Sequence, residues 1–153
     1  MHKEWTTMGK GTSARIVHTP EVQAYLDSIN DWMSARLKKG LKSLDMVLPL
    51  DERMSDSTVI ANAVYKLRQA LTTITEKQWW EYAEAYINLR AENEDKKLIY
   101  LTEETLENLE VIGEYLKDNY SALPHLTHGK SLNRKLIILF ALQYTAENVV
   151  GLV

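Results

Sequence analysis

The chain has 153 residues, of which 45% are hydrophobic and 25% charged, a composition typical of a folded globular protein. It contains no cysteine, which excludes a disulfide-bonded scaffold and a cysteine-ligated zinc site. No apolar run approaches the roughly 18 residues of a membrane span, and the first residues lack the apolar stretch of a signal peptide. We therefore expect a cytoplasmic protein with no membrane partner.

The formal net charge is −3, whereas proteins that bind nucleic acids are usually basic. The charges are unevenly distributed along the chain. Residues 1–20 hold three cations against one acid, and residues 128–136 hold three cations and no acid. Acidic residues are concentrated in 76–95 and 103–118. This segregation predicts one basic face on an acidic body.

The chain opens with an arm, a strand and a helix. Residues 1–12 contain two glycines among polar residues, which is typical of a flexible arm. Residues 13–18 form a short segment that is β-branched in its middle, which predicts a strand. Thr19 followed by Pro20 indicates a helix start, and apolar residues continue at helical spacing over 22–37.

Two further helices are predicted after a loop. Residues 55–57 offer N-caps for a helix whose apolar positions run over 59–71. Residues 75–93 form a third helix with an aromatic face and an acidic face. Its aromatic residues could stack on bases, but their helical spacing favours packing or an oligomer interface. They are Trp79, Trp80, Tyr82 and Tyr86.

The second half of the chain repeats the order of the first. Residues 96–101 predict a strand, and Thr102 is an N-cap followed by two acidic residues that suit the helix dipole. An apolar stripe over 106–116 predicts a helix. Asn133 is a plausible cap for a last helix over 136–148.

These similarities indicate an internal repeat. A shift of 83 positions places Thr19 on Thr102 and Ile16 on Ile99, and a shift of 78 places Ser55 on Asn133. The repeats are residues 13–71 and 96–150, joined by a connecting helix in 72–95. One short strand leaves its backbone groups unpaired, so we expect the two strands to pair. The predicted fold is mainly α with a short two-stranded antiparallel ribbon, a tandem pseudo-dimer in one chain.

A two-stranded ribbon is one of the few elements that fit the major groove of DNA, where its outward side chains can reach base edges. By contrast, the chain has no glycine-rich phosphate loop and no nucleophile motif. We therefore expect no enzyme activity, no cofactor and no small-molecule substrate. The pair His125 and His128 lacks further metal ligands, so we interpret it as a loop feature.

The second repeat resembles the ribbon-helix-helix family, the class of the Arc, MetJ and plasmid copy-number repressors. The resemblance lies in residues 98–109, LIYLTEETLENL, and 132–142, LNRKLIILFAL, with a weaker match over 54–64. It implies sequence-specific binding of double-stranded DNA, as a transcriptional repressor or a plasmid or viral accessory factor. It also allows self-association on adjacent half-sites. The stretches between paired helices are longer than the family's tight turn, and Leu98 stands where the family has a polar side chain.

The expected register separates an inward from an outward face of the ribbon. Ile16, Ile99 and Leu101 are predicted to point into the core. Arg15 could contact guanine, although a solvated charge at a strand edge is the alternative. The outward candidates for base contacts are Ser13, Arg15, Val17, Lys96, Leu98 and Tyr100.

Candidate phosphate contacts lie in the basic segments and at the starts of the second helices, where backbone N–H groups and the helix dipole favour an anion. Simple capping is the alternative, and Asp56 opposes phosphate binding at the first of these helices. The candidates are Lys10, Ser55, Ser57, Lys130, Asn133, Arg134 and Lys135. In the rival hypothesis both strand candidates are loops, and the chain is an all-α protein interaction module that uses the aromatic helix 75–93.

Overall fold

The structure, a computed structural model, describes residues 13–38, 55–92 and 96–151. The predicted arm 1–12 with Lys10, and the loop that precedes Ser55, lie outside these residues. Strand β1 (Ser13–Val17) pairs antiparallel with β2 (Lys96–Tyr100), with Ser13 opposite Tyr100 and Val17 opposite Lys96. The predicted ribbon is therefore confirmed, and the alternative in which both segments are loops is wrong.

The rest of the described chain is mainly helical. The α-helices are α2 (Pro20–Lys38), α3 (Asp56–Gln69), α4 (Glu76–Glu92), α5 (Glu103–Asn119) and α6 (Arg134–Tyr144). Shorter elements are a 3₁₀ turn (Leu71–Thr73), strands β3 (Thr127–His128) and β4 (Ser131–Leu132), and a π-helical segment (Thr145–Val150).

The helix starts follow from side-chain caps. The side chains of Thr19, Ser55, Thr102 and Asn133 each accept a hydrogen bond from the backbone N–H three residues later, at 3.1–3.4 Å. Each bond satisfies a donor that the first helical turn leaves unpaired. These caps confirm the predicted starts of α2, α3, α5 and α6.

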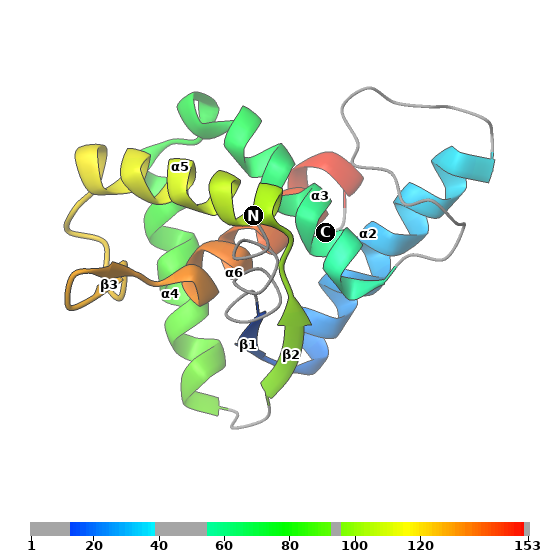
Figure 1. The fold of residues 1–153 in the computed structure, drawn as a ribbon, viewed down its shortest axis with the longest axis horizontal. Helices are drawn as coiled ribbons and strands as arrows, with labels where there is room; N and C mark the ends of the chain where they lie inside the picture. The colour runs from blue at the N-terminus through cyan, green and yellow to red at the C-terminus, as the bar shows by residue number, and fades with distance from the viewer. Residues whose placement is uncertain (1–12, 39–54, 93–95, 152–153) are drawn as a thin grey trace, which may run out of the picture.

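The ribbon lies in the lower part of the view in Figure 1, below α6 and between α4 and α2. In this view α6 is central, α4 covers one flank and α2 the opposite flank. Helix α3 packs against α5 and α6, and α6 also contacts β1 and α2. One hydrophobic cluster thus contains residues from both halves of the chain.

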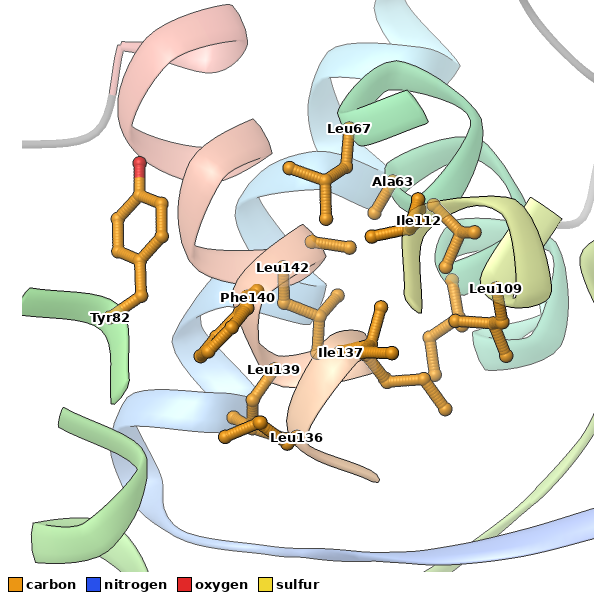
Figure 2. Packing of buried hydrophobic residues seen from close by; sticks show 14 of the residues in the cluster. Ala63, Leu67, Tyr82, Leu109, Ile112, Leu136, Ile137, Leu139, Phe140 and Leu142 are labelled. Atoms are coloured by element: carbon orange, nitrogen blue, oxygen red, sulfur yellow. The ribbon is translucent and has the colours of Figure 1, made fainter. Parts of the chain in front are cut away.

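Helix α6 is buried all round its axis over residues 136–142. All seven residues of 136–142 are apolar, and each is at most 3% exposed. Figure 2 shows five of these side chains among Ala63 and Leu67 of α3 and Leu109 and Ile112 of α5, namely Leu136, Ile137, Leu139, Phe140 and Leu142. A helix that is apolar on every face is typical of the centre of a core. The ribbon is therefore supported by a well-packed base.

Two local features differ from the expectations. The last α-helix ends at Tyr144 rather than near residue 148, and the π-helical segment follows it. There the buried Thr145 hydroxyl donates to the Ala63 carbonyl oxygen at 3.4 Å, which fixes this segment to α3. The hairpin β3–β4 was not expected either, because two-residue strands are too short to show alternation.

Candidate nucleic-acid interface

The outward face of the ribbon exposes polar, basic and apolar side chains together. Ser13, Arg15 and Lys96 are exposed. Leu98 is 42% exposed and Tyr100 is 64% exposed. Arg15 stands directly opposite Leu98 across the ribbon. The outward face carries the cations Arg15 and Lys96, and neither strand contains an acid, so this face combines positive charge with accessible apolar surface.

Val17 does not belong to this exposed face, and its assignment as an outward residue is wrong. It is 4% exposed and is part of the hydrophobic core cluster. Ile16, its neighbour on the opposite face of the strand, is also fully buried. The strict alternation of a strand breaks down here because Val17 is the last residue of β1 and the chain turns into α2.

The underside of the ribbon is anchored by apolar packing and by one ion pair. Ile16, Ile99 and Leu101 are at most 5% exposed, as the register predicted. Lys97 contacts Asp56, in the first turn of α3, with Nζ 2.7 Å from Oδ2. Neither side chain is fully exposed, at 28% and 37%. The ion pair fixes β2 to α3, and through it the Asp56 carboxylate at the α3 N-terminus is bound to Lys97. The sequence gives no local sign of the role of Lys97, because its partner lies in a distant element.

A basic hollow of about 540 Å³ adjoins the start of β1. The exposed cations Lys130, Arg134 and Lys135 line it, and Ser13 forms its border with the ribbon. Four of the predicted contact residues are thus brought together beside one end of the ribbon. The other wall is formed by α5 and carries Glu110, Glu114 and Lys117. Lys117 forms an ion pair with Glu114, with Nζ 3.9 Å from Oε2.

Asn133 is the exception among the predicted phosphate contacts on this side. It is 2% exposed, and its Oδ1 accepts from the Leu136 N–H at 3.4 Å. Its Nδ2 donates to the His125 carbonyl oxygen at 2.9 Å, and lies 3.5 Å from the Tyr86 hydroxyl. All the polar groups of the side chain are used within the protein. Asn133 is therefore a buried cap that positions Arg134 and Lys135, and not a surface contact.

The equivalent end of α3 has a different character. Ser55 is exposed and accepts from the Thr58 N–H at 3.2 Å, while Ser57 is half-buried. Asp56 places a carboxylate in the first turn, where α6 has Arg134. A carboxylate there already satisfies the positive end of the helix dipole and repels phosphate. The two second helices therefore present opposite charges at their starts.

Helix α4 is part of the core rather than a separate connection. Trp79, Tyr82 and Tyr86 are at most 4% exposed. The Trp79 ring packs 5.7 Å from that of Phe140 in α6 and meets Tyr82 edge-on at 6.2 Å. Burial, with a smaller contribution from Glu147, raises the pKa of the Tyr82 phenol to about 12. Packing is thus the role of these three aromatic residues.

One face of α4 remains accessible. Trp80 is 41% exposed and Ile87 is 36% exposed. They line a second hollow of about 410 Å³. Its other lining residues are Lys77, Glu81, Glu84 and Pro124, none of them from the ribbon.

No helix within 13–38, 55–92 and 96–151 is both long and apolar enough to cross a membrane. Within the same residues, no group of three or more histidine, aspartate or glutamate side chains is placed to hold a metal ion. Comparison of the chain with protein-family models, with curated proteins and with solved structures finds no match.

Proposed function

We propose that the chain is a sequence-specific, double-stranded DNA-binding protein that inserts its ribbon into the major groove. In this proposal two ribbon-helix-helix units in one chain replace the two subunits of a dimer. The observation that carries it is the pairing of β1 with β2, because this creates an isolated two-stranded ribbon with an exposed, acid-free face. Such a ribbon fits the major groove, where each base pair presents a distinct pattern of groups.

Two pairs of equivalent residues have the same environment in both halves, which supports the tandem arrangement. Thr19 and Thr102 cap the first helices through the same hydrogen bond, each at 3.1 Å. Ile16 and Ile99 are both buried beneath the ribbon. The second helices cross over between the halves, since α3 contacts β2 and α6 contacts β1. This interlocking is what a dimer of strand-helix-helix units produces when each unit completes the other.

The two halves differ at the surface, so the DNA site is expected to be asymmetric. The strands read SARIV in β1 and KKLIY in β2, so they present different side chains to the bases. The basic hollow with Lys130, Arg134 and Lys135 adjoins β1, whereas Asp56 occupies the corresponding start of α3. A single chain would then grip the phosphates more strongly on one side of the ribbon. A palindromic site would require two chains on adjacent half-sites.

The proposed role is that of a transcriptional repressor or regulator, or of a plasmid or viral accessory factor. Such roles need specific binding and no chemical step. The net charge of −3 lowers the affinity of the chain for DNA of any sequence. The cations near the ribbon favour contact between DNA and that side of the protein.

The test begins with selection of preferred sites from a random duplex pool with the full chain. Binding to a selected site is then measured across a salt series. Arg15→Ala should weaken specific binding by about 1–3 kcal/mol through the loss of one bidentate base contact. Lys77→Ala is the matched control, because it removes an exposed cation that lies away from the ribbon. Absence of sequence preference, or equal effects of both variants, would refute the proposal.

A further inference from the structure

The ribbon exposes two large apolar side chains on the face that the proposed function directs at DNA. Leu98 is 42% exposed and Tyr100 is 64% exposed. Their inward neighbour Ile99 is 1% exposed, so the strand still alternates at these positions. Exposed apolar side chains that adjoin on one face of a strand, rather than scattered singly, are typical of an interaction site. A partner that binds this face would therefore place an apolar group against Leu98 and Tyr100.

The charges around Leu98 favour a nucleic acid over a protein as this partner. Arg15 is its direct partner across the ribbon, and Lys96 lies two residues away on the same face. Neither strand carries an acidic residue, and the adjoining hollow adds three exposed cations of the α6 side. A narrow apolar strip between cations matches the major groove, where the thymine C5 methyl is the apolar group beside the polar base edges.

We infer that Leu98 is a specificity-determining residue that contacts the C5 methyl group of a thymine, with Tyr100 beside it. This inference rests on the proposed DNA-binding function and adds to it the kind of base that β2 recognises. Arg15 carries the complementary contact, to the two acceptors of a guanine. The preferred site would therefore contain both a guanine and a thymine.

The spacing of these two bases follows from the register. Residues directly opposite across an antiparallel pair have Cβ atoms about 4.5–5.5 Å apart. Successive base pairs are stacked about 3.4 Å apart along the duplex. Arg15 and Leu98 are opposite each other, so their target bases should lie within about two base pairs. A strand with a polar residue at the Leu98 position would leave the thymine C5 methyl group without this apolar contact.

The experiment uses the full chain and a duplex carrying a site selected from the random pool. Each thymine is replaced in turn by uracil, which removes only the methyl group. Wild-type binding should weaken by about fourfold at one thymine near the guanine, the factor for exposure of one buried methyl group. Leu98→Ala should bind thymine and uracil equally at that position. Ile87→Ala, which shortens an exposed apolar side chain of α4, should keep the fourfold discrimination.

The possible failures are distinguishable. Specific binding without a uracil-sensitive position, or full discrimination by Leu98→Ala, would overturn this inference and leave the proposed function intact. A chain without sequence-specific binding would overturn both. Sedimentation without DNA tests the rival occupant: if the wild type self-associates and Leu98→Ala is monomeric with unchanged DNA affinity, the apolar strip is a protein interface and the inference is wrong.

Discussion

Ile99 provides a sharp test of the ribbon register. Its side chain is 1% exposed and lies beneath the ribbon, whereas the adjacent Leu98 is 42% exposed on the opposite face. Ile99→Ala removes three carbon atoms from a packed core and leaves a cavity, so the free energy of unfolding should fall by about 2–5 kcal/mol. Leu98→Ala removes the same number of carbon atoms from the surface, and its effect should stay within about 0.5 kcal/mol.

The measurement is urea unfolding of both variants, followed by tryptophan fluorescence, since the fully buried Trp79 lies in the shared core. With a slope of about 1–3 kcal/mol per molar urea, the midpoint of Ile99→Ala should move down by about 1 M or more. The midpoint of Leu98→Ala should barely move. A one-residue slip of β2 would exchange the two faces of the strand. A larger loss for Leu98→Ala than for Ile99→Ala would therefore refute the register.

Three further predictions concern the core. Arg68 Nη1 donates to Asn108 Oδ1 at 2.6 Å, and Asn108 is 5% exposed. Arg68→Ala should lower the free energy of unfolding by about 1–3 kcal/mol, because the buried Asn108 oxygen would lose its donor. An unchanged urea midpoint would contradict this. The unfolded chain loses the Tyr82 proton near its ordinary pKa of 10, whereas the folded protein keeps it until about pH 12, so stability should fall as pH rises across this interval. Tyr82→Phe should show a smaller fall in pH-dependent urea unfolding, and an identical pH dependence would count against the assignment. Fragments 1–94 and 95–153 should each be unfolded or self-associated when alone, and should form a folded heterodimer when mixed. Circular dichroism and sedimentation would measure this. A fragment that is a well-folded monomer would contradict the shared core.

The parts of the fold that were predictable depend on local chemistry. A threonine before a proline marks a helix start because the hydroxyl caps unpaired N–H groups and the ring fits the first turn, and Thr19 confirms this. The equivalence of Ile16 and Ile99 predicted which face of each strand is buried. The need of each strand for a partner then predicted the pairing itself.

The parts that were not predictable depend on contacts between distant elements. Lys97 is held by Asp56, and nothing in the local sequence of β2 indicates this partner. Asn133 was correctly identified as a cap, but its burial results from its packing near Tyr86 and His125. Val17 follows the pattern of an outward residue and is buried because the chain turns there. Local pattern gives the type of each element, and tertiary packing decides which side chains remain accessible.

The pairing of β1 with β2 also determines when the ribbon can fold during synthesis of the chain. Val17 and Lys96 pair with each other although 78 residues separate them in the sequence. Closing so long a segment has an entropic cost that is recovered only when both strands are present, so pairing of this kind slows folding. During synthesis β1 leaves the ribosome before β2. Its backbone groups stay unpaired until the ribosome has produced β2 and the helices that follow it. A truncated chain that ends before residue 96 would therefore lack the surface proposed to bind DNA.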